Sequence, residues 1–334
     1  MKDTSNLKTE ILSRLNPGLS VGIMSHVEPD GDGFCASLAL QHFLRARFIE
    51  SEIIIDQSNL DRYQFLMEGA IIREFKSGMR YDLMFVLDCN SYIRIGEREE
   101  LVQTAGHTIL IDHHVPENGV IEGDYSFVDT SAASVGAIIF RALQPEIEAL
   151  PDDPRIKIAN CLYVTLLNDT NNFINTNTDA EVFRIAADLT ECGISPSGLY
   201  KSYFLNHDPL ELRYIGEVLS TIELYDNNRI LYMHSTLAMQ HRNDLTADSI
   251  MNLTRWVQGV NTVQAIAYMR EEKPGLYKLS LRSSTIDVNA IAVAYGGGGH
   301  KSASGALISG EIDTLKEDLL ARLAGALEST RADA

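Results

Sequence analysis

Residues 109–114 read Ile109-Leu110-Ile111-Asp112-His113-His114, a short apolar run that ends in three adjacent titratable side chains. An apolar run of this length predicts a strand that is buried on both faces, as in a parallel sheet. Three such groups in succession at the end of a strand are difficult to explain by packing, because charged side chains are rarely buried without partners. This stretch therefore predicts a parallel sheet with a functional site at its edge.

Three further apolar runs lie upstream and also end in polar residues. They span 21–25, 53–56 and 83–88, and end in Ser25-His26, Asp56 and Asp88. The intervening segments are long enough for crossover helices, and strands that alternate with helices form a parallel sheet. Open sheets of this kind bind ligands at the carboxyl ends of their strands, so we expect the polar groups to meet there.

The chain of 334 residues is long enough for two domains, each with its own core. After the parallel sheet, helices are expected at about 134–143, 156–167, 180–192 and 197–205, and a connector at 210–224. Later strands are expected at 230–233, 263–270, 277–282 and 306–309, and later helices at 249–258, 287–295 and from 313. We predict a parallel-sheet α/β domain over 1–192, a helical linker over 193–226 and a smaller α/β domain over 227–334.

The composition limits the partners of the protein. With 28 basic and 46 acidic residues the net charge is −18, which opposes binding to long nucleic acid and favours small substrates. Bound divalent cations would reverse the field locally and allow a phosphate to bind. The four cysteines form no C-x-x-C pair, and no apolar run is long enough to span a bilayer. These features predict a soluble cytoplasmic protein without membrane partners.

A second group of titratable residues lies in the segment 25–32, Ser-His-Val-Glu-Pro-Asp-Gly-Asp. It places His26, Asp30 and Asp32 within one turn, and the Pro and Gly between them shape the backbone so that the side chains can converge. Imidazole together with carboxylates suits Mn, Fe or Zn better than Mg alone. Taken by itself, Asp-Gly-Asp is also common in solvated turns and calcium loops.

Two further aspartates fit the same site. Asp88 ends a strand that is too apolar to be exposed, so its charge needs a cation or strong partners, and a bridge between two metals would provide them. An aspartate that caps the following loop is the simpler alternative for Asp88 alone. Asp169, preceded by Asn168 at the end of an apolar helix, would complete the set.

With these residues the chain resembles the DHH phosphoesterase superfamily. Its triplet matches Asp112-His113-His114, its first motif matches His26-x-x-x-Asp30-x-Asp32, and Asp88 and Asp169 match two more motifs in the expected order. The first half thus resembles a DHH catalytic domain. One departure follows Asp32, where family members commonly read Ala-Leu-Gly-Ser and this chain reads Gly-Phe-Cys-Ala at 33–36. Small residues are largely kept, so we expect altered packing and intact metal binding.

The second half resembles the DHH-associated substrate-binding domain through residues 281–283 and 296–305. Together the halves resemble bacterial oligoribonucleases that also dephosphorylate 3'-phosphoadenosine 5'-phosphate (pAp). The glycines at 296–299 have an independent interpretation as well, because glycine lets backbone N–H groups approach an anion closely. Arg282 would add a planar fork for a terminal phosphate and His300 a further donor. A bare run of four glycines is otherwise typical of a helix end.

The resemblance implies a role for each site residue. It implies one metal held by His26, Asp30 and Asp88, and a second held by Asp32, Asp88, His113 and Asp169, with Asp88 as the bridge. His114 would contact the phosphate, and Asp112 would orient an imidazole. Arg282, Gly297, Gly298, Gly299 and His300 would bind the substrate. The metals are expected to be Mn²⁺, with Mg²⁺ or Co²⁺ as alternatives.

The resemblance leads to a hypothesis about the reaction. We expect a Mn-dependent phosphoesterase and exoribonuclease that hydrolyses very short RNA from the 5' end and converts pAp to a nucleoside monophosphate. A phosphodiesterase of linear dinucleotides such as pApA and pGpG would need the same residues, and a non-catalytic nucleotide sensor is an alternative from another class. The sequence leaves the oligomeric state open, a homodimer included.

Overall fold

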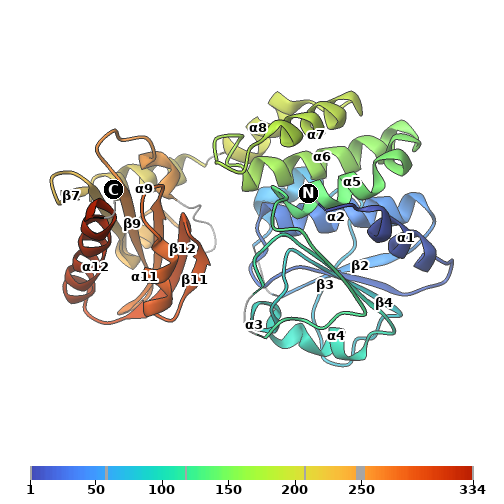
Figure 1. Cartoon of the computed structure of the whole chain (residues 1–334), viewed down its shortest axis with the longest axis horizontal. Coiled ribbons are helices and arrows are strands. Elements are labelled where there is room, and N and C mark those ends of the chain that lie inside the picture. Colours follow the sequence, from blue (N-terminus) through green and yellow to red (C-terminus); the bar gives the residue numbers. More distant parts are fainter. Residues whose placement is uncertain (1, 57–58, 117–118, 207, 246–252, 333–334) are drawn as a thin grey trace. The chain divides into compact units, whose positions relative to one another are not determined.

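The structure, a computed structural model, describes residues 2–56, 59–116, 119–206, 208–245 and 253–332. Its contacts divide the chain into two compact units, Met1–Asn206 and His207–Ala334, and the predicted α/β class is confirmed (Figure 1). The division falls inside the segment that the sequence suggests as a linker. Helix α8 (Pro196–Phe204) packs on the first unit, whereas α9 (Pro209–Leu219) buries Tyr214, Ile215 and Val218 in the second.

The first unit contains a six-stranded sheet in which all neighbouring strands are parallel. Its order is β3-β2-β1-β4-β5-β6, with β1 (Val21–Met24), β2 (Ser51–Ile55), β3 (Ile72–Glu74), β4 (Leu83–Leu87), β5 (Thr108–Asp112) and β6 (Tyr125–Val128). The chain builds outward from β1 in one direction and then returns to build outward from β4 in the other. The point between β1 and β4 is therefore the topological switch point, where sheets of this type bind ligands.

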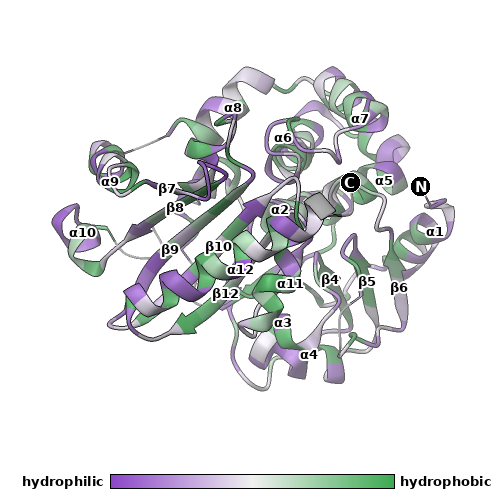
Figure 2. Ribbon diagram, turned by 60° about the vertical axis from the view of Figure 1, so that its left-hand side comes forward, coloured by the Kyte–Doolittle hydropathy of each residue, from purple (hydrophilic) through white to green (hydrophobic). Residues whose placement is uncertain are grey.

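Alternate residues of these strands enter two cores, as the pleat requires. Ile23 and Phe85 face one core, which is covered by α1 (Ser5–Arg14), α2 (Gly31–Ala46), α5 (Val135–Glu148), α6 (Asp152–Asp169) and α7 (Ala180–Glu191). Met24 and Val86 face the other, which includes residues of α3 (Tyr92–Ile95) and α4 (Glu99–Thr104). Burial on both faces explains why the strands are continuous apolar runs, visible as green β4 and β5 in Figure 2.

The second unit contains a mixed sheet of six strands in the order β11-β12-β10-β9-β8-β7. They are β7 (Glu223–Tyr225), β8 (Ile230–Ser235), β9 (Ala265–Lys273), β10 (Leu276–Ser283), β11 (Gly298–His300) and β12 (Ala303–Ser309). Only the β8–β9 pair is parallel among these described strands. Residues of α11 (Val288–Ala294) and α12 (Ile312–Ala332) share one core with the sheet, and residues of α9 and the 3-10 turn Leu253–Val257 share another.

Some local expectations differ from the structure. Of the helix expected at 249–258, residues 249–252 lie outside the described residues and Leu253–Val257 form a 3-10 turn. The sequence does not predict the strands β3, β7 and β11, because three residues at or near a sheet edge are too few for an alternation of apolar and polar residues to appear.

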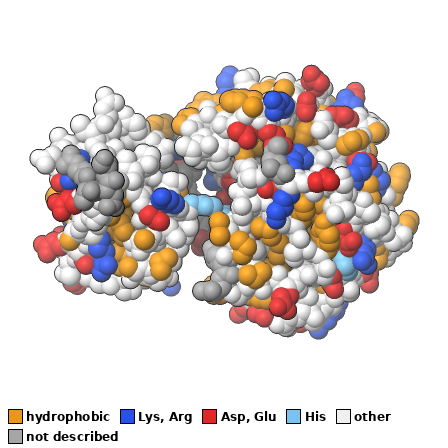
Figure 3. Space-filling view, in the orientation of Figure 1, with side chains coloured by type: hydrophobic (Ala, Val, Ile, Leu, Met, Phe, Trp, Pro, Cys, Tyr) orange, Lys and Arg blue, Asp and Glu red, His pale blue; other side chains and the backbone are white. Residues whose placement is uncertain are grey.

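The surface is charged and mixed. On the face drawn in Figure 3, acidic and basic side chains lie among one another over the first unit. Within the part of the chain that the structure describes, no helix has the length and apolar character that crossing a membrane requires.

Candidate active site

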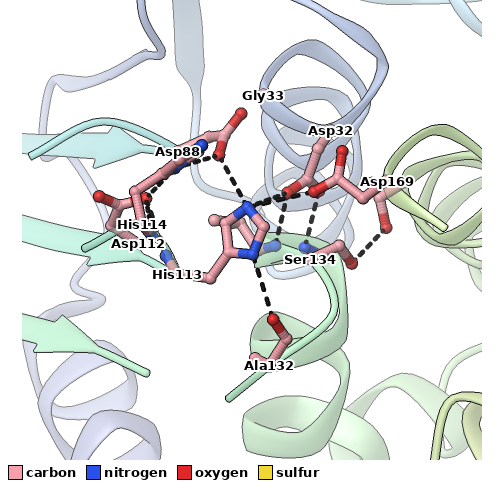
Figure 4. Close-up of polar contacts among 12 residues, drawn as sticks. Asp32, Gly33, Asp88, Asp112, His113, His114, Ala132, Ser134 and Asp169 are labelled. Carbon is pink, nitrogen blue, oxygen red and sulfur yellow. Dashed lines mark hydrogen bonds and ion pairs between the residues drawn. The ribbon is translucent and has the colours of Figure 1, made fainter. Parts of the chain in front are cut away.

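The predicted metal ligands come together at the switch point of the first unit, and Asp112 joins them through His114. Figure 4 shows the part of this cluster that contains Asp32, Asp88, Asp112, His113, His114 and Asp169. They come from strand ends and helix ends: His26 follows β1, Asp30 and Asp32 begin α2, Asp88 follows β4, Asp112 ends β5, His113 and His114 follow it, and Asp169 ends α6. Asp88 has φ = 58°, in the left-handed region. Asp and Asn tolerate that region better than other residues with a side chain, so this backbone favours the residue found there.

One group of possible metal ligands consists of His26, Asp30 and Asp88. The Nε2 atom of His26 lies 3.8 Å from Asp30 Oδ1 and 3.6 Å from Asp88 Oδ2. Its Nδ1 lies 2.7 Å from the carbonyl oxygen of Val27, which favours the tautomer with a proton on Nδ1. Nε2 is then left as the atom that can bind a metal.

A second group consists of Asp32, His113 and Asp169. The Nε2 atom of His113 lies 3.1 Å from Asp169 Oδ2, 3.8 Å from Asp32 Oδ2 and 3.5 Å from Asp88 Oδ1. The Nδ1 atom of His113 faces the carbonyl oxygen of Ala132 at 3.1 Å, so this ring too turns Nε2 toward the carboxylates (Figure 4). The two oxygens of Asp88 thus face different imidazoles, an arrangement that suits a bridging ligand.

His114 forms a third group with Asp88 and His113. Its Nδ1 lies 3.3 Å from Asp88 Oδ1 and 2.9 Å from Asp112 Oδ1. Asp112 is fully buried and also accepts the backbone N–H groups of His113 and His114 and the side-chain amide of Asn90. Asp112 is therefore saturated by protein donors and orients His114, whereas the other carboxylates retain capacity for a metal.

The electrostatics of the cluster match a cation site. Burial opposes protonation of His26, but Asp30 and Asp88 outweigh it and raise the His26 pKa to about 10. Burial and the neighbouring Asp169 and Asp88 raise the pKa of Asp32 well above its usual range. Oδ1 of Asp88 and Nε2 of His113 are buried and make no hydrogen bond of good geometry among the described residues, although the two atoms face each other at 3.5 Å. In the absence of a cation, protons on His26 and Asp32 compensate the negative charge of the carboxylates. A divalent metal can take over this compensation, so the residues fit a metal centre.

Asp32 is held in place by the start of α5. Its oxygens accept the backbone N–H groups of Val135 at 2.6 Å and Gly136 at 3.1 Å, and Ser134 caps the same helix by accepting the N–H of Ala137. A helix N-terminus carries partial positive charge, which stabilises this buried carboxylate. No sequence pattern indicates this contact, because residues 32 and 135 are brought together only by the packing of α2 on α5.

Two asparagines near the ligands were not predicted as functional. Asn90 contacts Asp112, and the Asn168 side-chain amide reaches both Asp30 Oδ2 at 3.2 Å and Asp169 Oδ1 at 2.8 Å. Proximity in sequence was the one signal that could have found them, since Asn90 lies two residues after Asp88 and Asn168 directly before Asp169.

In the second unit, three strands bring Arg282 and His300 into one row. Both residues are register partners of Ala303, one on each side of β12, and directly opposite residues share a face of the sheet. Arg282 is half-buried and its pKa is lowered by burial. Its guanidinium donates to the carbonyl oxygen of Leu281 at 2.7 Å, and among the described residues no carboxylate forms an ion pair with it. Such a guanidinium can bind an anion.

The glycines of this region have a packing role that the sequence did not indicate. A Cβ at Gly299 would lie 2.7 Å from Ala303 O, and one at Gly297 would lie 2.6 Å from Ala306 Cβ, so both are required by the close approach to β12. Gly298 has open space for a Cβ and pairs with Gly305. Gly296 and Gly297 follow the end of α11 and donate their N–H groups to its last carbonyl oxygens, whereas Gly298 and Gly299 belong to the exposed strand β11.

Carboxylates and imidazoles gathered at the switch point of a parallel sheet, with the DHH triplet among them, are typical of a phosphoesterase, and three groups of them could hold metal ions. Residues 20–166 match the family described as "DHH family, N-terminal domain" and residues 232–329 match the "DHHA1 domain". The chain belongs to the DHH family and is a hydrolase, as the sequence predicts.

Curated relatives match along nearly the whole chain. A bifunctional oligoribonuclease and PAP phosphatase NrnA of Mycoplasma genitalium is 27% identical over 303 residues, covering 90% of this chain and 92% of that protein. The proteins of the same name from Thermus thermophilus and Bacillus subtilis are 28% and 26% identical, covering 89% and 94% of this chain and 87% and 97% of theirs.

A solved structure shares the fold. An exopolyphosphatase-related protein from Bacteroides fragilis is 24% identical and superimposes with a TM-score of 0.83, covering 98% of this chain and 96% of that one. The likeness supports the two-unit architecture.

Proposed function

We propose that this protein uses two divalent metal ions, Mn²⁺ foremost, to hydrolyse very short RNA from the 5' end and pAp to nucleoside monophosphates. The observation that carries the proposal is the position of Asp88, whose two oxygens face His26 and His113 in two adjoining ligand groups. Relatives named as oligoribonuclease and PAP phosphatase support the substrate class.

His26, Asp30 and Asp88 are proposed to hold one ion, and Asp32, Asp88, His113 and Asp169 the other. Bound in this way, two cations supply an activated water and neutralise the charge that develops on the phosphoryl oxygens. Imidazoles and carboxylates together suit Mn²⁺, while Mg²⁺ and Co²⁺ are the alternatives to compare.

Residues around the proposed metal ions are assigned roles in orienting and binding the substrate. Asp112 accepts from Nδ1 of His114 and fixes the direction of the ring, and we assign His114 the contact with the substrate phosphate. The carboxylates of Asp32, Asp88 and Asp112 are buried. Because little water reaches them, their electrostatic interactions are stronger than in bulk water. The residues Arg282, Gly297, Gly298, Gly299 and His300 of the second unit are proposed to bind the distal part of the substrate.

A comparison of substrates tests this function. Purified protein with Mn²⁺ is assayed on pAp, pApA, pGpG, RNAs of increasing length from the dinucleotide, and long single-stranded RNA, with a metal-free sample in EDTA as the control. We expect release of mononucleotides from the shortest RNAs and of phosphate from pAp, with rates that fall on long RNA because the net charge of −18 opposes its approach.

Absence of turnover on both pAp and short RNA would reject the proposal. Tight pAp binding without turnover would indicate a nucleotide sensor, and a strong preference for pGpG or pApA a dinucleotide phosphodiesterase.

A further inference from the structure

The side chain of Asn168 lies between the two ligand groups of the candidate metal centre. Its Nδ2 donates to Oδ2 of Asp30 at 3.2 Å and to Oδ1 of Asp169 at 2.8 Å. Asp30 belongs to the group with His26, and Asp169 belongs to the group with His113. One amide nitrogen therefore connects a carboxylate from each group.

The orientation of this amide is fixed from behind by Tyr203. The Tyr203 hydroxyl donates to Oδ1 of Asn168 at 2.6 Å, so the amide oxygen faces α8 and the amide nitrogen must face the carboxylates. Tyr203 is 3% exposed, and burial raises its pKa, so the hydroxyl stays protonated and remains a donor. The Arg62 guanidinium lies 4.6 Å from the centre of the Tyr203 ring, a cation–π contact that helps to hold the ring in place.

The start of α2 is shaped to admit this pair. A Cβ at Gly31 would overlap the Tyr203 hydroxyl and lie 2.8 Å from Oδ1 of Asn168. Gly31 lies between Asp30, which belongs to the group with His26, and Asp32, which belongs to the group with His113. Only a residue without a side chain lets the hydroxyl and the amide come this close to the ligand loop.

We infer that Asn168 and Tyr203 are positioning residues that hold Asp30 and Asp169 at a fixed separation and thereby set the spacing of the two metal ions. This inference rests on the proposed two-metal function. Hydrogen bonds to metal-binding carboxylates orient them, and loss of such a bond typically lowers metal affinity or activity about 10- to 100-fold. Tyr203 acts through Asn168, because its hydroxyl donates to the amide oxygen of that residue.

The test removes one oxygen atom. Tyr203→Phe keeps the buried ring and deletes only the donor to Asn168. Tyr81→Phe is the matched control, because Tyr81 is also buried in the first unit and its hydroxyl donates to a side chain, Glu52, at 2.8 Å. Asn168→Asp replaces the donor with a third carboxylate between Asp30 and Asp169. Thermal unfolding of each metal-free variant confirms that it is folded.

Mn²⁺ titration followed by calorimetry and low-temperature EPR gives a readout independent of activity. The original protein and Tyr81→Phe should bind two ions and show the signal of an exchange-coupled pair. Tyr203→Phe should bind its second ion about 10-fold or more weakly and show a larger share of isolated Mn²⁺, and Asn168→Asp should change the spectrum too. In steady-state assays with pAp, Tyr203→Phe should lower kcat more than it raises KM.

The outcomes distinguish the positioning role from the two-metal function. If the original protein binds a coupled pair and Tyr203→Phe matches it in affinity and spectrum, the positioning role is wrong and the proposed function stands. If the original protein binds no ion pair at all, the two-metal function fails and the inference fails with it. Equal losses in Tyr81→Phe and Tyr203→Phe would also overturn the inference, because they would show a general effect of deleting a buried hydroxyl.

Discussion

Asp88 combines an unusual backbone with a central chemical position. Its φ of 58° lies in the left-handed region, and its carboxylate faces the imidazoles of His26, His113 and His114. Burial opposes its negative charge, yet the neighbouring histidines outweigh burial and lower the pKa of Asp88. The neighbouring histidines therefore favour the ionised carboxylate, which is the form of Asp88 that binds a metal.

Asp88→Asn tests the bridge without disturbing the backbone, because Asn also tolerates the left-handed region. We expect loss of one of the two ions and a fall in kcat of roughly a thousandfold, since a metal contributes several kcal/mol to the transition state. Metal content by atomic absorption and turnover of pAp measure the two effects. Retention of both ions with full activity would remove Asp88 from the bridging role.

Arg282→Ala tests the second unit. A half-buried guanidinium without a carboxylate partner among the described residues is suited to a substrate phosphate. We expect KM for short RNA to rise about 10-fold or more with a smaller change in kcat, because the contact is made in the bound ground state as well as in the transition state. Lys278→Ala, on the same strand β10 and exposed, is the comparison variant. An unchanged KM for Arg282→Ala would exclude Arg282 from the substrate site.

His42 should make stability pH-dependent. It is buried in α2, and burial, followed by the positive charges of Arg45 and Lys157, lowers its pKa to about 4. The unfolded chain, with a His pKa near 6.5, takes up a proton between these values while the folded protein does not. This residue therefore costs no stability above about pH 6.5 and destabilises the fold progressively as pH falls toward 4.

The size of this effect follows from linkage. Between about pH 7.5 and pH 5, His42 should account for a loss of roughly 2 kcal/mol in the free energy of unfolding. Urea unfolding of the original protein and of His42→Leu at both pH values gives the difference. An equal pH dependence in the two proteins would contradict the assignment.

At the scale of elements, the first turns of two helices build the candidate metal centre. The first turn of α2 carries Asp32, and Asp30 caps the same helix by accepting the N–H groups of Asp32 and Gly33. The first turn of α5 holds the Asp32 carboxylate. Because α5 also packs on α6, a change in the packing of these two helices would move the N–H groups that hold Asp32.

Gly136→Ala should disturb both the packing of α5 on α6 and the contact of α5 with Asp32. A Cβ at Gly136 would lie 2.6 Å from Thr165 Cβ on α6, and the same residue donates its N–H to Asp32. Overpacking of this kind costs about 1–3 kcal/mol of stability, and we expect weaker Mn²⁺ binding as well. Gly216→Ala is the control, because Gly216 lies in helix α9 with nothing within 4 Å of its Cβ position.

This control should be stabilised by roughly 0.5–1 kcal/mol, the usual gain when Ala replaces Gly within a helix. Chemical unfolding and Mn²⁺ calorimetry compare the two variants. If Gly136→Ala were as stable as the original protein, the close packing of α5 on α6 would not be as described.

At the scale of the whole molecule, the two units have separate cores, and the candidate metal ligands all lie in the first. The single tryptophan, Trp256, lies in the 3-10 turn of the second unit. Tryptophan fluorescence therefore follows the second unit, whereas circular dichroism follows helices of both.

Mn²⁺ should raise the unfolding temperature of the first unit more than that of the second. A ligand at 100 times its Kd contributes about 2.7 kcal/mol per site, so two ions correspond to a shift of roughly 10–20 °C for a domain of this size. We expect part of the dichroism transition to shift by this amount while the midpoint of the fluorescence transition moves less. Melting curves with Mn²⁺ and with EDTA measure this, and equal shifts by both probes would show that the units unfold together.

The amino-acid sequence alone predicted the parallel sheet and the principal candidate ligands. Continuous apolar runs can be buried only between two layers, and polar residues that end such strands must meet at one edge. This is why the strand-end positions of His26, Asp88 and the triplet at Asp112 follow from sequence patterns. The folded chain brings His26, Asp88, His113 and His114 into groups that could hold a metal ion.

How these ligands are held depends instead on the packing of the folded chain. The contact of Asp32 with the start of α5, and the chain from Tyr203 through Asn168 to Asp30, join residues more than 30 positions apart. Neither contact leaves a periodic pattern, because each depends on how helices pack rather than on the local preferences of the chain. The need for glycine at positions 297 and 299 also arises from tertiary packing, because β12 lies too close to leave room for a side chain. Local sequence thus specified the chemistry of the site, while long-range packing specified its geometry.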